Sequence, residues 1–319
     1  MVVYPRTMAF VDKISTCVDV EVDDREHWKV AFRDLSSGPT VDEERYKFGK
    51  IFERYKEAFW INVSTGCRCL VQFDPRKRGM DYARLEWNPR TVGNHSASQI
   101  ARLLNDICPG VTTAQLAQGA QTRVDFSFDL LDLQIDALTV ATELRRTVSG
   151  IWQTHTEYFP KGPINSIELG RRESDRSLRV YDKRLEQAKA QYGDSLDHRE
   201  LYRLAMERRP ITRVELTLRK GLDARQLVCS INPFLKYQFS HLAHSRGRMP
   251  GHEWKFFIDA CKQRGSQAAL SLIENKKLRK QYRDLLFQNP PSWWQPELIW
   301  QESLAAYSSI WSLPNPINV

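Results

Sequence analysis

Several short segments of the chain are rich in β-formers or alternate between apolar and polar residues, and this pattern predicts β-strands. They span residues 59–64, 67–73, 83–90, 122–133, 166–170, 177–184 and 211–220, and the third of them is expected to stop at Pro89. Successive side chains of a strand point to opposite faces, so most of these strands would carry one apolar and one polar face. Residues 10–80 are expected to consist of short strands joined by loops.

Other segments repeat their apolar residues at helical spacing. Residues 96–107, 134–148 and 195–209 are predicted helices, and a serine at position 96 or 98 would cap the first. After residue 221 the strand pattern stops, and helices are predicted over 252–265, 266–288 and 296–311. The prediction is an α+β fold: largely antiparallel sheet with helices on its apolar face over residues 1–220, and a helical C-terminal extension over 221–319.

Composition and charge narrow the functional class. The 319 residues carry 47 Lys and Arg against 39 Asp and Glu, a net charge of +8, which favours a polyanionic partner such as nucleic acid. No segment approaches the roughly 20 apolar residues of a membrane helix, and the N-terminus lacks the pattern of a secretory signal. The six cysteines are scattered. We therefore expect reduced thiols, a cytoplasmic location and no membrane partner.

Two predicted strands share a tetrapeptide frame. Residues 122–125 read Thr-Arg-Val-Asp and residues 212–215 read Thr-Arg-Val-Glu, and in both the arginine and the acid fall on the polar face. Arg84 and Glu86 repeat the arrangement. The plain interpretation is a one-sided sheet with solvated ion pairs. The alternative is that the acids converge into an oxygen-rich site for Mg²⁺ or Mn²⁺.

A further predicted strand, SLRVYDKR at 177–184, places a tyrosine between cations. Arg179, Tyr181 and Lys183 would share its polar face, opposite Leu178 and Val180. Nearby positive charge favours the phenolate of a tyrosine, and a phenolate can attack phosphorus. The same tyrosine could also be an ordinary surface residue.

Residues 120–220 resemble the replication initiation factor family, which includes rolling-circle initiators of plasmids related to pT181 and replication initiators of filamentous phages. The resemblance rests on Arg123-Val124-Asp125, on the segment LGRRESDRSLRVYDK at 169–183, and on Arg213-Val214-Glu215. It implies an enzyme that nicks one strand at a plus origin through Tyr181, holds the 5′ end as a phosphotyrosine, and rejoins ends at termination. Arg179 and Lys183 would offset charge in the transition state.

The resemblance also implies a metal-dependent DNA endonuclease and strand transferase, with Mg²⁺ or Mn²⁺ as cofactor. Asp125 and Glu215 are the carboxylates carried over as metal ligands, and Glu168 and Glu86 are weaker candidates. Glu215 could alternatively orient Arg213 or act as a general base. Another class of rolling-circle initiators uses a His-hydrophobe-His metal motif. The seven histidines of this chain do not form one, so a metal site is expected to be carboxylate-based.

Origin DNA is the expected partner, which the protein would bind as a duplex and cut at a single-stranded site. The reaction would take place in the cytoplasm of a bacterial host, and the host helicase and polymerase would act after it. The oligomeric state is open, and a dimer is possible. The predicted DNA-binding residues lie in two basic windows: Arg171, Arg172, Arg176, Arg184, Lys276, Lys277, Arg279 and Lys280. Trp293 and Trp294 would either stack on unpaired bases or pack the tail onto the body. A non-catalytic DNA-binding protein and a tyrosine relaxase acting in DNA transfer are the alternative functions.

Overall fold

Two compact units make up the chain, which is seen here in a computed structural model. Unit 1 comprises Met1–Ala9, Ser127–Leu216 and Asn232–Trp300, and unit 2 comprises Phe10–Phe126, Thr217–Ile231 and Gln301–Val319. The structure describes residues 5–37, 46–48, 54–64, 67–107, 110–142, 149–153, 164–171, 174–193, 196–242, 251–288 and 290–314. This partition differs from the predicted 1–220 and 221–319, because two strands and one helix each contribute residues to both units.

Unit 2 contains an antiparallel set of strands in the order β2-β3-β4-β5-β1-β6. The bounds are β1 Phe10–Val18, β2 Tyr46–Phe48, β3 Tyr55–Ser64, β4 Cys67–Pro75, β5 Ala83–Trp87 and β6 Ala120–Leu131, the last ending in unit 1. The strands predicted at 59–64, 67–73 and 122–133 are confirmed, and the strand predicted at 83–90 is confirmed over Ala83–Trp87. The register places Glu86 of β5 opposite Ser15 of β1 on one side and Leu70 of β4 on the other.

Helix α1, Val22–Ser37, corrects the expectation that residues 10–80 hold only strands and loops. Its buried face carries Trp28 and Phe32, whose rings contact those of Phe59 and Phe73 on the sheet. The two aromatic residues are four apart, which places them on one face of a helix. Burying these large rings on one face stabilises a helix that the short-strand interpretation missed.

Other helices of unit 2 cover the apolar face of its sheet. They are α2 Pro89–Val92, α3 Ser96–Ile107, α4 Thr113–Gln118, α7 Ala224–Val228 and most of α11 Pro296–Trp311. Trp87 of β5 donates its indole N–H to Ser96 Oγ and packs edge-on against Trp311, while Phe126 packs against Tyr307. The helix predicted at 96–107 and the covering of the apolar face are both confirmed.

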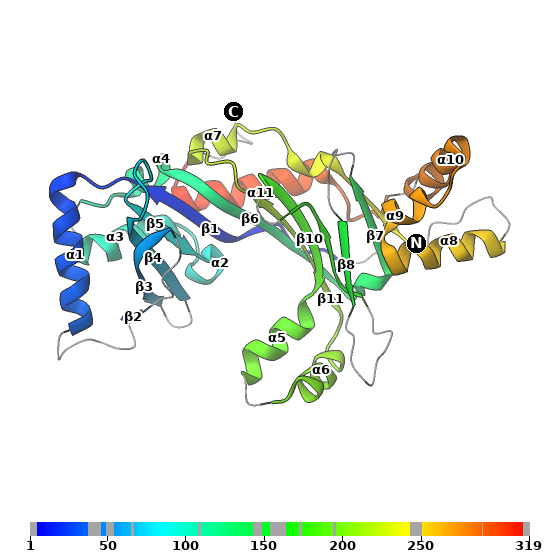
Figure 1. Cartoon of the computed structure of the whole chain (residues 1–319), viewed down its shortest axis with the longest axis horizontal. Helices are drawn as coiled ribbons and strands as arrows, with labels where there is room; N and C mark the ends of the chain where they lie inside the picture. The colour runs from blue at the N-terminus through cyan, green and yellow to red at the C-terminus, as the bar shows by residue number, and fades with distance from the viewer. Residues whose placement is uncertain are drawn as a thin grey trace. The chain divides into compact units, whose positions relative to one another are not determined.

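Unit 1 contains the strand order β6-β11-β10-β9-β8, and Figure 1 labels β6, β8, β10 and β11 of this set. The bounds are β8 Ser149–Gln153, β9 Ile164–Leu169, β10 Arg176–Asp182 and β11 Ile211–Leu218, the last ending in unit 2. Strands β9 and β10 form the predicted antiparallel hairpin. Between β10 and β11 the chain forms two helices, α5 Lys183–Tyr192 and α6 His198–Met206, which pack through Ala188, Leu201 and Ala205.

The helix predicted at 134–148 is wrong where the structure describes it. A single 3₁₀ turn, Ile135–Ala137, leads into strand β7, Leu138–Thr142, which pairs with β12, Tyr237–His241. The β-branched residues Thr139, Val140 and Thr142 fit a strand better than a helix. Strand β12 also shows that strands do not stop at residue 221.

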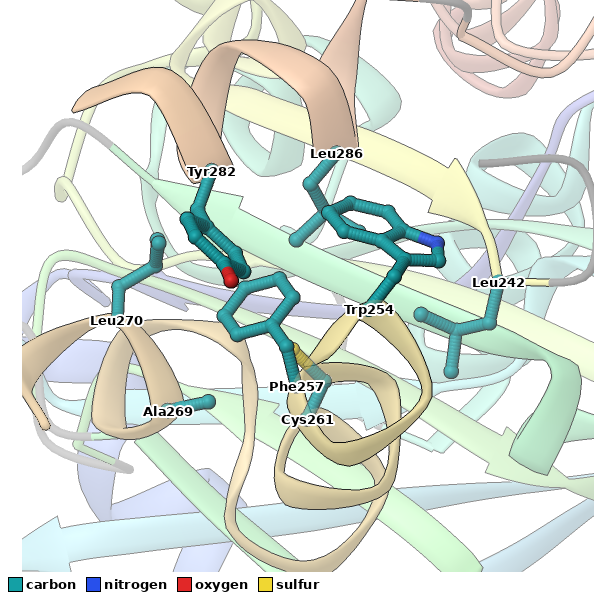
Figure 2. Close-up of a cluster of buried hydrophobic side chains, with 8 residues drawn as sticks. All are labelled: Leu242, Trp254, Phe257, Cys261, Ala269, Leu270, Tyr282 and Leu286. Carbon is teal, nitrogen blue, oxygen red and sulfur yellow. The ribbon is translucent and has the colours of Figure 1, made fainter. Parts of the chain in front are cut away.

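Three helices near the C-terminal end of unit 1 share their own hydrophobic cluster, drawn in Figure 2. They are α8 Gly251–Arg264, α9 Ser266–Ser271 and α10 Lys276–Phe287. Trp254 stacks on Tyr282, and Phe257 meets the same tyrosine edge-on. The single helix predicted over 266–288 is interrupted because Asn275 caps a new helix, accepting hydrogen bonds from Lys277 N and Leu278 N.

The tryptophan pair before α11 is packed inside unit 1. Trp293 and Trp294 are both buried, and both contact Phe239 of β12. Trp293 also contacts Phe128, and Trp294 contacts Phe234. The packing interpretation of this pair is therefore confirmed, since the rings are not accessible for stacking on bases.

Candidate functional site

Tyr181 lies near the end of strand β10, and two cations contact its ring. Arg179 Cζ lies 4.4 Å from the ring centroid, and Lys183 Nζ lies 5.9 Å from it. Arg179 and Tyr181 share a face, as the alternation predicted. The tyrosine is only 7% exposed, so it is not an ordinary surface residue. Positive charge beside a phenol stabilises the anion that a nucleophilic tyrosine must form.

The chain leaves the strand directly after Tyr181. Asp182 caps helix α5, so Lys183 and Arg184 are helical, whereas the sequence placed them on the strand. Lys183 Nζ bonds Glu186 Oε1 at 2.6 Å, one turn along the helix. It therefore approaches the tyrosine ring from the N-terminal turn of α5.

Arg184 is buried, although it was predicted to bind DNA. Its guanidinium donates to both carboxylate oxygens of Asp182, with contacts from 2.6 to 3.1 Å. The hydrogen bonds that the guanidinium donates to Asp182 raise its pKa above the ordinary arginine value, against the effect of burial. In this conformation Arg184 fixes the strand-to-helix turn after Tyr181 and does not present a surface cation.

Glu168 lies opposite Arg179 on the neighbouring strand β9. Its Oε1 atom is 3.3 Å from Arg179 Nε, and the side chains are 24% and 48% exposed. One guanidinium therefore contacts both the carboxylate and the Tyr181 ring. Sequence analysis placed Glu168 on a polar face but gave no reason to pair it with Arg179, because register between strands is not encoded in either strand alone.

Strand β11 carries Arg213 and Glu215 from the second Arg-Val-acid frame. Arg213 is buried and pairs bidentately with Asp129 of β6, at 2.6 Å and 2.9 Å. Glu215 is half-buried. Asp129 was missed in the sequence, although its position four residues after Asp125 places both acids on one face of β6. The two frames are thus used differently despite their matching letters.

Unit 2 pairs its acids within or beside their own strands. Asp125 accepts two hydrogen bonds from Arg123, at 2.9 Å and 2.6 Å. Glu86 bonds Arg84 at 2.6 Å and lies 3.2 Å from Lys13. Burial opposes ionisation of Glu86, but the neighbouring cations Lys13 and Arg84 outweigh it and lower its pKa. Both acids are thus paired with cationic side chains of the protein itself.

Among the described residues, neither unit assembles a cluster suited to a metal ion. In the part of the chain that the structure describes, no group of three or more His, Cys, Asp or Glu side chains is placed to hold a metal ion. Of the four predicted carboxylates, Asp125, Glu86 and Glu168 already contact cationic side chains. Mg²⁺ or Mn²⁺ at these carboxylates stays a prediction.

The hairpin loop before β10 holds the first basic window. Arg171 is exposed and Arg176 is half-buried at the start of the strand, while Arg172 lies outside the described residues. Gly170 begins the loop with a φ of +95°, and an added Cβ there would lie 2.9 Å from Arg176 O. The glycine is therefore required by the turn that brings Arg171 and Arg176 to the same end of the hairpin.

Helix α10 holds the second basic window. Lys276, Lys277 and Lys280 are all exposed, and the helical repeat brings Lys276 and Lys280 to one side. Arg279 is different, because its Nε donates to Ile273 O at 2.8 Å and ties the helix to the preceding turn. Three of the four predicted cations are thus accessible, and the fourth has a structural bond.

None of the described helices has the length and apolar character needed to cross a lipid bilayer.

Comparisons with protein-family models and with curated proteins find no match. Among solved structures, the chain is similar to the rolling circle replication initiator protein from Geobacillus stearothermophilus, at 14% identity and a TM-score of 0.36. That likeness covers 82% of this chain and 98% of the other. A superposition this loose assigns neither fold nor activity, which rest on the residues themselves.

Proposed function

We propose that this protein is a rolling-circle DNA replication initiator that nicks the plus origin through Tyr181. The observation that carries the proposal is the pair of cations, Arg179 and Lys183, on the Tyr181 ring at the end of β10. The ordered motifs from Arg123 to Glu215 that resemble replication initiators support it. The net charge of +8 also suits a DNA substrate.

In the proposed reaction, the Tyr181 oxygen attacks the scissile phosphorus and the P–O3′ bond breaks. The phenolic proton is lost and the departing 3′ oxygen gains one, so a free 3′-OH primes synthesis while the 5′ phosphate stays on the tyrosine. Arg179 and Lys183 offset the charge that builds on the phosphorane oxygens. Attack of a 3′-OH on the phosphotyrosine reverses these changes and joins ends at termination.

The remaining parts of the proposal concern the cofactor and the partners. Mg²⁺ or Mn²⁺, held by carboxylates among Asp125, Glu215, Glu168 and Glu86, would polarise the phosphate. The basic face of α10 and the β9–β10 loop would hold duplex DNA near the cut. Host helicase and polymerase would then extend the 3′-OH, in the cytoplasm of a bacterial host.

The test uses the supercoiled replicon that carries the gene and labelled single-stranded oligonucleotides that tile it, with Mg²⁺, Mn²⁺ or EDTA. Wild-type protein is expected to nick the plasmid and to form a covalent adduct that survives denaturant and maps to Tyr181. Tyr181→Phe should abolish both. Tyr192→Phe is the matched control, because Tyr192 on α5 also has an arginine over its ring, Arg208 at 5.9 Å, and it should nick normally.

A second function, non-catalytic DNA binding on the same fold, is favoured by the low exposure of Tyr181, which is 7%. A tyrosine that stays covered cannot reach a phosphate. The decisive outcome is wild-type protein that binds the replicon DNA but cuts neither the replicon nor any oligonucleotide, with Mg²⁺ or with Mn²⁺. In that case the binding function replaces the enzymatic one.

A further inference from the structure

One arginine, Arg179, contacts two groups whose roles in the proposed reaction conflict. Its guanidinium lies over the Tyr181 ring at 4.4 Å, and its Nε lies 3.3 Å from Glu168 Oε1. A scissile phosphate that reaches Tyr181 needs the same guanidinium. Glu168 and that phosphate are both anions, so they compete for Arg179 and repel one another.

We propose that Glu168 is a positioning residue that occupies the place of the scissile phosphate in the free protein. It holds Arg179 over the Tyr181 ring until a DNA phosphate takes the arginine over. This inference rests on the proposed function for its substrate, but its resting state is a property of the free protein. It gives Glu168 a role in place of a metal ligand.

The register of the hairpin builds this contact. Glu168 and Arg179 are directly opposed across β9 and β10, where side chains on the same face lie closest. On its other side, Glu168 is opposed by Gly150 of β8, which has no side chain to offer. The carboxylate is therefore directed toward one cross-strand cation, which is the one that covers the tyrosine.

The strength of the pair suits a contact that must be released. Exposed ion pairs are weak, and Arg179 is 48% exposed. Glu168 should therefore favour the covered arrangement by at most about fivefold. A phosphate can accept two hydrogen bonds from a guanidinium in a fork, and such contacts are stronger than one long ion pair. When DNA is present, a phosphate therefore replaces Glu168 as the partner of Arg179.

The first measurement is hydroxyl-radical footprinting of the full-length protein without DNA, read at Tyr181 by mass spectrometry. Glu168→Gln should raise oxidation of the Tyr181 ring about two- to fivefold, because an unheld arginine covers the ring less of the time. Asp132→Asn is the matched control: it removes the same charge and frees a paired arginine, Arg209, and it should leave Tyr181 oxidation unchanged.

The second measurement asks whether Glu168 acts through Arg179. In an Arg179→Met background, Glu168→Gln should no longer change Tyr181 oxidation. Glu168→Gln alone should also raise the affinity for a single-stranded oligonucleotide, by about the same factor as it raises oxidation of Tyr181. This gain in affinity should exceed the gain in Asp132→Asn. Unchanged oxidation in Glu168→Gln, or an equal rise in the Arg179→Met background, would overturn the assignment. Absence of nicking would count against the proposed function and leave the footprint result standing.

Discussion

The buried ion pair between Arg213 and Asp129 gives a prediction whose size follows from the structure. The side chains are 3% and 10% exposed, and the guanidinium donates two hydrogen bonds at 2.6 Å and 2.9 Å. Removing one partner from such a pair leaves a buried charge without its neighbour, which costs about 3–5 kcal/mol. Arg213→Met and Asp129→Leu should each lower the free energy of unfolding of unit 1 by about that amount.

Replacing both partners measures the interaction energy between Arg213 and Asp129 apart from their contacts with other residues. Asp129→Leu with Arg213→Met leaves neither charge buried, and apolar replacements of a buried pair are often close to neutral. The double variant should therefore be much more stable than the sum of the single losses predicts, with a coupling energy above about 2 kcal/mol. Arg213→Lys keeps the charge but loses the fork, and should fall between wild type and Arg213→Met.

The assay is urea unfolding followed by far-UV circular dichroism and by tryptophan fluorescence. Trp293 packs against Phe128, the neighbour of Asp129, so its emission reports on this part of unit 1. Additive losses in the double variant, or single losses below about 1 kcal/mol, would refute the view that the pair acts as one buried unit. A stable Arg213→Met protein that fails to bind DNA would show that this arginine contacts DNA, against its burial.

Three further results are expected. Gly170→Ala should destabilise the β9–β10 hairpin by about 1–3 kcal/mol, since φ is +95° and the new Cβ would lie 2.9 Å from Arg176 O, and amide hydrogen exchange at β10 would detect it. Glu86→Gln should be less stable than wild type by about 1–3 kcal/mol at pH 7. Because cations lower the pKa of Glu86 in the folded protein, its contribution to the free energy of unfolding is complete above the ordinary carboxyl pKa. That contribution is lost as the pH falls through the lowered pKa, so thermal unfolding at acid pH should give wild type and Glu86→Gln similar stabilities. Lys276→Ala with Lys280→Ala should reduce the salt slope of duplex binding by about 2, whereas Lys255→Ala on α8, also exposed, should leave it unchanged.

The sequence predicted the strands well where alternation or β-branched residues were strong. Residues 83–87 and 122–131 form strands as expected, because their apolar residues occur at every second position. It failed at 134–142, where three apolar residues at helical spacing were outweighed by β-branched neighbours and by pairing with β12, nearly 100 residues away. Such a partner cannot be read from the segment itself.

The candidate site was predictable in its residues and not in its contacts. Alternation placed Arg179 beside Tyr181, and the structure agrees. It placed Lys183 on the same strand, whereas Asp182 caps a helix that begins there. An Asp two residues before an Arg at the start of a helix was the signal for that cap and was not used. The pairing of Arg213 with Asp129 depends on which strands are neighbours, which the tertiary fold decides.

Arg84, Arg123 and Arg179, unlike Arg213, each contact the side chain two residues further along their own strand. On β5 and β6, Arg84 and Arg123 each bond the acid two residues further along the same face. On β10 the residue two positions after Arg179 is Tyr181, so the guanidinium lies over a phenol where the other strands have a carboxylate. Tyr181 therefore occupies a position at which an arginine of the same strand stabilises an anion. A phenolate formed there during attack on a phosphate would receive the interaction that the carboxylates of β5 and β6 receive permanently.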